Sequence, residues 1–138
     1  MASRIGNERN VSDVLCALLF SGGVIVTLRE RQSLFVRLVA QLIQKATEMG
    51  FDLSFGETYR TPEQAILNAK AGKGTKNSLH CDRLAIDLNL FRDGRFLGSS
   101  EDHRKLGEWW ETLHPDCRWG GRFDDGNHYS LTPDGKRA

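Results

Sequence analysis

The stretch Leu84-Ala85-Ile86-Asp87-Leu88-Asn89-Leu90 holds the pattern that decides the fold. Successive side chains of a β-strand point to opposite faces of a sheet, so Leu and Ile residues at every second position form one apolar face. Asp87 then lies on the opposite face, on a rigid element backed by the core. A carboxylate in such a place needs a partner. The partner is a metal ion, the neighbouring Arg83 or water, and the strand pattern alone leaves these three open.

Helices and strands alternate on either side of this strand. Apolar residues recur at three- and four-residue steps before Gly50, which indicates a helix that ends at that glycine. Thr61 and Gln64 are spaced as a capping box, with Pro62 at the first helical position. In chain order we expect helix 30–49, strand 51–55, helix 61–72, strand 84–90, helix 99–113 and strand 128–131. This order predicts an α+β fold with a small antiparallel sheet flanked by helices.

The chain of 138 residues is long enough for one hydrophobic core. Its net charge of +1 provides no general attraction for nucleic acid. A local basic cluster, Lys70, Lys73, Lys76 and Arg83, is either a solvated loop or an attraction for an acidic substrate. Three cysteines without paired spacing argue against a disulfide framework and for a reducing compartment, and we expect all three to be small buried residues.

Residues 1–27 differ from the rest of the chain. Arg4 and Arg9 precede a mostly apolar stretch from Val11 to Val26. A weak signal or anchor segment is one interpretation. The stretch is interrupted by Asp13 and by small residues, so we expect no stable membrane insertion. The alternatives are elements packed on the domain or an extension without a catalytic role, and residues 28–138 are expected to form the domain.

Candidate metal ligands occur in three segments, at His80, Asp87 and His128. A catalytic zinc site uses three protein ligands and keeps one position open. Two neutral imidazoles and one carboxylate leave such a site with a charge of +1, which lowers the pKa of bound water. Cys81 follows His80 directly, but in an extended segment the two side chains point apart, so Cys81 is not expected to be a ligand.

Other residues could complete a hydrolytic site. Asp125 or its neighbour Asp124 could act as the general base. Arg60 could stabilise an oxyanion or bind a carboxylate, although a surface ion pair with Glu57 or Glu63 is the alternative. Ser78 could donate a hydrogen bond to a substrate. For three other side chains the sequence is less specific. Trp119 either lines a cleft or packs in the core, and we expect His103 and His114 to be surface or structural residues.

Three sets of motifs together resemble the M15 peptidase family: Thr58-Tyr59-Arg60-Thr61-Pro62-Glu63-Gln64, then Ser78-Leu79-His80 with Asp87 seven positions after the histidine, and finally Trp119-Gly120-Gly121 with Asp125-Gly126-Asn127-His128. The family includes D-alanyl-D-alanine carboxypeptidases and phage endolysins that cut the L-alanyl-D-glutamate bond of peptidoglycan. The resemblance covers about residues 28–138. It implies the α+β fold of the hedgehog and D-Ala-D-Ala peptidase group.

The resemblance also implies roles for residues at matching positions. His80, Asp87 and His128 match the zinc ligands, with one zinc per chain, and Asp125 matches the base. Ser78, Arg60 and Trp119 are expected to contact the peptidoglycan stem peptide. We expect a monomeric phage-type endolysin, made in the host cytoplasm and acting on the cell wall or in the periplasm. A D,D-carboxypeptidase and a non-catalytic zinc-stabilised wall-binding module are the alternatives.

Overall fold

The computed structural model describes residues 26–133. The signal or anchor interpretation concerns residues that lie almost wholly outside this range. The elements in chain order are α2 (Leu28–Glu48), β1 (Asp52–Phe55), α3 (Pro62–Lys70), the 3₁₀ helix η1 (Leu79–Asp82), β2 (Ala85–Arg92), β3 (Arg95–Leu97), α4 (Ser100–Leu113), β4 (Cys117–Trp119), the 3₁₀ helix η2 (Gly120–Phe123) and β5 (His128–Leu131).

The five strands form one sheet in which every pairing is antiparallel. The order is β1-β2-β5-β4, and β3 pairs with β2 beyond the end of the β2–β5 pairing. The α+β fold with a small antiparallel sheet is therefore confirmed. The register places Asp87 of β2 directly opposite His128 of β5. This pairing brings together two segments that are far apart in the sequence.

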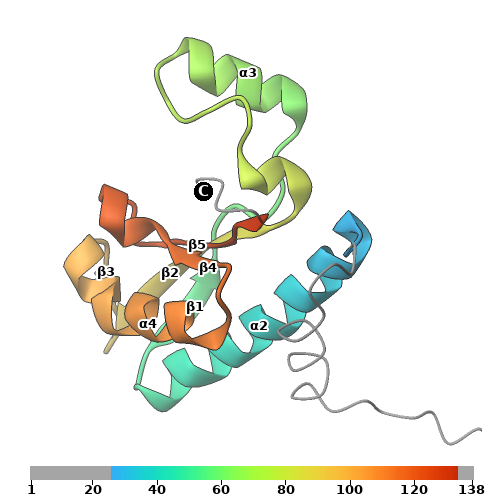
Figure 1. Cartoon of the computed structure of the whole chain (residues 1–138). Coiled ribbons are helices and arrows are strands. Elements are labelled where there is room, and N and C mark those ends of the chain that lie inside the picture. The colour runs from blue at the N-terminus through green and yellow to red at the C-terminus, as the bar shows by residue number, and fades with distance from the viewer. Residues whose placement is uncertain (1–25, 134–138) are drawn as a thin grey trace, which may run out of the picture.

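Helices α2 and α4 pack against the sheet and enclose the core (Figure 1). A capping box between Thr27 and Glu30 starts α2, and Gly50, with φ of +86°, follows its end. Most of the expected apolar stripe of α2 is buried, and so are Leu84, Ile86, Leu88 and Leu90. The alternation that the sequence of β2 predicts is thus confirmed, and Asp87 points away from the core.

Helix α3 and the segment that follows it stand apart from the sheet (Figure 1). The Thr61 side chain accepts a hydrogen bond from the backbone N–H of Gln64, as predicted. The second half of the predicted capping box is wrong, because the Gln64 side chain donates to Asn68 instead. Residues 71–78 lead from α3 to η1 and hold two glycines with positive φ, Gly72 and Gly74.

Two strands and one burial state differ from the sequence predictions. Strand β3 follows the turn at Asp93-Gly94, where both residues have positive φ, and β4 ends in Trp119; neither strand is among those expected from the sequence. Cys117 is buried as expected, whereas Cys81 is partly exposed. Cys16 lies outside the described residues.

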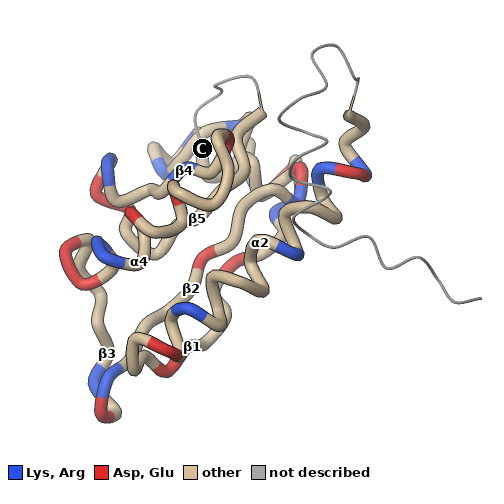
Figure 2. The backbone as a smooth tube through the Cα atoms, turned by 60° about the horizontal axis from the view of Figure 1, so that its bottom comes forward, with Lys and Arg blue, Asp and Glu red and all other residues tan. Residues whose placement is uncertain are grey.

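Charged residues of both signs are interspersed along the chain, including along α2 (Figure 2). This distribution agrees with the net charge of +1. Within residues 26–133, no helix is both long enough and apolar enough to cross a membrane.

Candidate metal centre and active site

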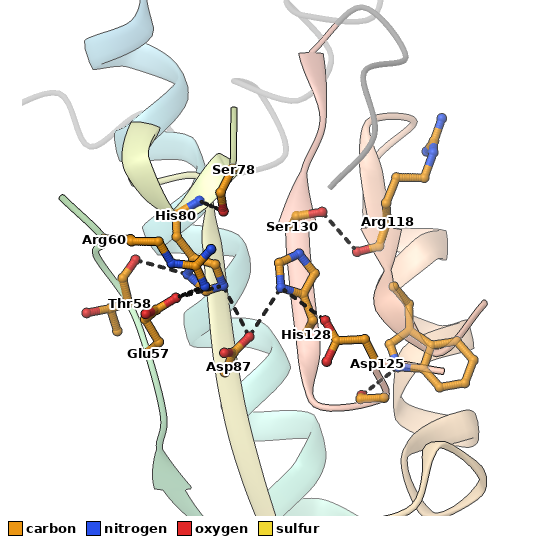
Figure 3. A network of polar contacts seen from close by, with 12 residues as sticks. Glu57, Thr58, Arg60, Ser78, His80, Asp87, Arg118, Asp125, His128 and Ser130 are labelled. Carbon is orange, nitrogen blue, oxygen red and sulfur yellow. Dashed lines mark hydrogen bonds and ion pairs between the residues drawn. The ribbon is translucent and has the colours of Figure 1, made fainter. Parts of the chain in front are cut away.

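Three side chains from three elements converge on the face of the sheet that is turned away from the core. His80 comes from η1, Asp87 from the middle of β2, and His128 from the start of β5 (Figure 3). The Oδ1 atom of Asp87 lies 3.3 Å from Nε2 of His80 and 3.2 Å from Nδ1 of His128. One potential ligand atom from each residue lies within 4.8 Å of the other two. The sequence reasoning named these three residues, and the fold brings them together.

The local structure explains how each of the three is positioned. Antiparallel pairing fixes Asp87 and His128 opposite each other. Ser78 caps η1, and its Oγ accepts a hydrogen bond from the backbone N–H of His80 at 3.2 Å. Arg83, with φ of 56°, ends η1 and turns the chain into β2. His80 therefore lies in a short helix and not in the extended segment that was expected, although Cys81 is still outside the group.

The connection between β1 and α3 supports both His80 and Asp87 from the side. The backbone N–H of Gly56 donates to the Asp87 carbonyl at 2.8 Å, and the Glu57 carbonyl accepts from the Asp87 N–H at 2.9 Å. The Thr58 carbonyl lies 3.5 Å from Nδ1 of His80. A β-carbon at Gly56 would lie 3.0 Å from the β-carbon of Asp87, so this close approach depends on glycine. Such outer contacts orient potential ligands and fix histidine tautomers.

The electrostatic environment keeps Asp87 ionised. Burial alone would raise the pKa of its carboxyl, but hydrogen bonds with His128 and His80 outweigh this and lower the pKa to about 2. The site therefore offers an ionised carboxylate between two histidine rings. His128 is buried, and its Nε2 has no hydrogen-bond partner within the described part of the chain.

The chemistry of these donors fits a metal ion. Imidazole nitrogen and carboxylate oxygen are ligands for zinc and other divalent transition metals. Two ring nitrogens flank one carboxylate oxygen at separations that three ligands of one ion would have. His80, Asp87 and His128 could therefore bind a metal ion.

A cavity of about 490 Å³ opens above the three residues. Its walls come from α3 and the segments on either side of it, from η1, and from η2 and the loop that leads to β5. It is lined by Arg60, Asn68, Lys73, Gly74, Thr75, Ser78, His80, Asp87, Gly120, Phe123, Asp125 and His128. The sequence predicted no role for Asn68, Gly74, Thr75 or Phe123, which carry no motif signal of their own, and Gly120 had none beyond its place in the Trp119-Gly120-Gly121 motif.

Two neighbouring acids point in different directions. Asp125 lines the cavity, and its Oδ2 lies 4.0 Å from Nδ1 of His128. Asp124 adopts φ of 59°, and its Oδ1 accepts a hydrogen bond from the Ser100 hydroxyl at the start of α4. Of these two acids, Asp125 is therefore the one that lines the cavity. Partial burial raises the pKa of the Asp125 carboxyl; the nearby His128 opposes this shift and Asp87 adds to it.

Arg60 lines the cavity and also forms an ion pair. Its Nη2 donates to Oε1 of Glu57, and only 15% of the Arg60 side chain is exposed. Arg60 therefore both lines the cavity and forms an ion pair with Glu57, one of the two partners expected from the sequence. The same Glu57 oxygen lies 3.7 Å from Nε2 of His80. Glu57 precedes the Thr58–Gln64 motif, so motif reasoning gave it no role beside His80.

Trp119 does not reach the cavity. Its side chain is buried, and the indole Nε1 donates to the Gly126 carbonyl at 2.7 Å. A β-carbon at Gly107 or at Gly121 would lie about 2 Å from the indole ring, so the ring is packed between the two glycines. Of the two expectations for Trp119, this geometry favours packing over a place in the cleft. Its packing holds the loop that carries Asp125.

The remaining histidines lie away from the site. His103 is buried on α4, where its Nδ1 is 2.9 Å from the Tyr129 hydroxyl. His114 ends α4, and its Nδ1 accepts from the Asp116 N–H. Burial is the main cause that lowers the pKa of both groups. Both have the structural role that was one of the two expectations for them.

Comparison with known proteins gives a structural likeness. No protein-family model matches the chain, and no curated protein gives a significant match. Among solved structures, the Serratia marcescens L-Ala D-Glu endopeptidase ChiX matches with a TM-score of 0.60 and 20% sequence identity. The match covers 71% of this chain and 77% of that one. The two chains therefore share a fold, which in ChiX is the fold of a peptidase.

Proposed function

We propose that this protein is a zinc metallopeptidase that hydrolyses peptide bonds in the stem peptides of bacterial peptidoglycan. The observation that carries the proposal is the convergence of His80, Asp87 and His128 at the floor of a cavity that Asp125 also lines. Three ligands and an open side are the arrangement of a catalytic zinc site, whereas structural zinc sites use four protein ligands. The match with an L-Ala D-Glu endopeptidase supports the substrate class.

Each residue has a role in this proposal. His80, Asp87 and His128 hold one zinc ion per chain, and zinc supplies a Lewis acid that polarises the scissile carbonyl and makes water more acidic. Asp125 accepts a proton from the attacking water and transfers it to the leaving amine. Arg60 stabilises negative charge that develops on the carbonyl oxygen. The Ser78 hydroxyl, whose oxygen already accepts from His80 N–H, keeps its own proton for a substrate carbonyl.

The proposed bond is L-alanyl-D-glutamate, cut from within the stem peptide. Its support is the resemblance to phage endolysins and the activity in the name of the structurally similar protein. We propose that residues 28–138 form the peptidase domain of a monomeric phage-type enzyme, made in the host cytoplasm and acting on the wall. A D-alanyl-D-alanine carboxypeptidase is the alternative, since the same ligands would serve it.

Digestion of purified peptidoglycan followed by mass spectrometry tests the proposal. We expect the zinc-loaded protein to release fragments with a new N-terminal D-glutamate, and we expect no release after treatment with a chelator. Released D-alanine would instead indicate the carboxypeptidase. Intact wall with zinc-loaded, folded protein would contradict a peptidase and leave a non-catalytic wall-binding module, which a pull-down with the same wall preparation detects.

A further inference from the structure

The cavity above the candidate metal centre has charges of opposite sign on its two sides. Asp87 and Asp125 come from β2 and from the loop before β5. Arg60 lies just before α3 and Lys73 lies just after it, and both line the cavity. A zinc ion held by Asp87 would balance the charge of that carboxylate, so Asp125 is the acid that repels a negatively charged group of a ligand from the first side, while the second side attracts it.

The two cations on the basic side are not equivalent. Arg60 is paired with Glu57 and is largely buried, so much of its charge is already balanced. Lys73 is exposed, and among residues 26–133 no carboxylate forms an ion pair with it. Of the basic cluster that the sequence shows, only Lys73 lines the cavity. Lys73 is thus the cation there whose charge is still available to a ligand.

The backbone around Lys73 sets where this residue lies. Its N–H donates to the Asn68 carbonyl at 2.7 Å, and glycines with positive φ, Gly72 and Gly74, stand on both sides of it. A β-carbon at Gly74 would lie 3.6 Å from Nη1 of Arg60, so the loop passes close to the guanidinium. Lys73 therefore belongs to a defined turn at the cavity wall, next to the residue proposed to bind the oxyanion.

We propose that Lys73 determines specificity: the cavity takes peptides with a free carboxylate on the residue next to the scissile bond, and the Lys73 ammonium binds that carboxylate. The inference rests on the proposed function and adds the direction of the substrate. The acidic residue of the peptide lies towards the loop after α3, because Lys73 attracts it there and Asp125 repels it from the other side.

Two synthetic peptides test this inference. They are identical except that the residue after the scissile bond carries a carboxylate in one and a carboxamide in the other. For the zinc-loaded wild type we expect kcat/KM to be about fivefold higher for the acid, the size of an ion pair at a partly exposed site, and we expect the difference to be in KM. Lys73→Ala should abolish this preference, and Lys73→Glu should reverse it.

Lys76→Glu is the matched control, because it makes the same charge change in the same loop at a residue that does not line the cavity. It should keep the preference for the acid. Equal kcat/KM for both peptides in the wild type, or a preference that survives in Lys73→Ala, would overturn the inference while leaving the peptidase proposal intact.

Measurements of peptide binding distinguish a failure of this inference from a failure of the proposed function. Fluorescence anisotropy of labelled peptides on zinc-loaded Asp125→Asn, with and without Lys73→Ala, measures the affinity for acid and amide without turnover. If neither peptide is hydrolysed by the wild type, the peptidase proposal fails. An acid preference in binding that disappears with Lys73→Ala would still support Lys73 as the carboxylate-binding residue, and equal binding of the two peptides would exclude it.

Discussion

Replacement of Asp125 by asparagine removes one charge from the cavity and leaves the shape of the side chain almost unchanged. The side chain is 62% exposed, so we expect the free energy of unfolding to change by less than about 0.5 kcal/mol. Its Oδ2 is 4.0 Å from Nδ1 of His128, and Asp125 is not among the three grouped ligands, so zinc binding should persist. Loss of a general base lowers kcat by about 10²- to 10⁴-fold, which is about 3–5 kcal/mol in the activation barrier.

Asp124→Asn is the control for this variant. It makes the same chemical change at the adjacent residue, and asparagine tolerates the positive φ found there. Its side chain is bonded to Ser100 and does not line the cavity, so kcat should stay within about twofold of wild type, as for a surface substitution. The assay is the initial rate of release of new amino groups from soluble wall peptides, with zinc content measured on the same samples. If Asp125→Asn retains more than a tenth of wild-type kcat with full zinc content, or if Asp124→Asn shows the larger loss, Asp125 is not the base.

Two further predictions concern metal and protonation. Removal of zinc by a chelator should abolish hydrolysis and lower the Tm by about 10 °C or more, since a ligand at a hundredfold excess over its Kd stabilises the fold by about 2.7 kcal/mol. Zinc added back should restore both the activity and the Tm, whereas the Tm of His80→Ala should not respond to zinc. Differential scanning fluorimetry that detects no zinc-dependent shift of the wild-type Tm would count against the site. Burial lowers the pKa of His103, although the Leu97 carbonyl and Asp102 oppose the shift. The unfolded chain therefore binds a proton at a higher pH than the folded chain, so this part of the stability is present above about pH 6.5 and is lost as the pH falls through the lowered pKa. Urea unfolding of metal-free wild type and His103→Gln at pH 7.5 and 5.5 isolates this effect, because the other titrating groups are common to both; an equal loss in the two proteins would show that His103 is not responsible.

Local patterns predicted those parts of the fold that are long enough to show a period. The alternation in β2 and the apolar stripe of α2 each extend over several residues, and both elements form where expected. β4 has three residues and η1 has four, which is too short for a periodic signal. The sequence could not decide between a cleft position and packing for Trp119, because the packing depends on Gly107 in α4 and Gly121 in η2, which approach the ring only in the folded chain.

The candidate site was predictable to a different extent for each residue. The strand pattern singled out Asp87 without any comparison. His80 and His128 became candidates through their order and spacing and through the resemblance to a family, and the structure then places both beside Asp87. Glu57 was named only as a possible partner of Arg60, because its contact with His80 joins segments on opposite sides of α3. Lys73 was visible as part of a basic cluster, but only the fold distinguishes it from Lys76.

The pairing of β2 with β5 also bears on the order in which the molecule assembles. Asp87 and His128 are 41 positions apart in the chain, so their alignment is a long-range contact with a large cost in loop entropy, and such contacts tend to form late in folding. We expect α2, whose hydrogen bonds are local, to form before any metal can be held with full affinity. Zinc uptake in a stopped-flow refolding experiment should then lag behind the recovery of helical circular dichroism, and simultaneous recovery would contradict this order. An unfinished chain would in that case hold an incomplete candidate metal centre until β5 is in place.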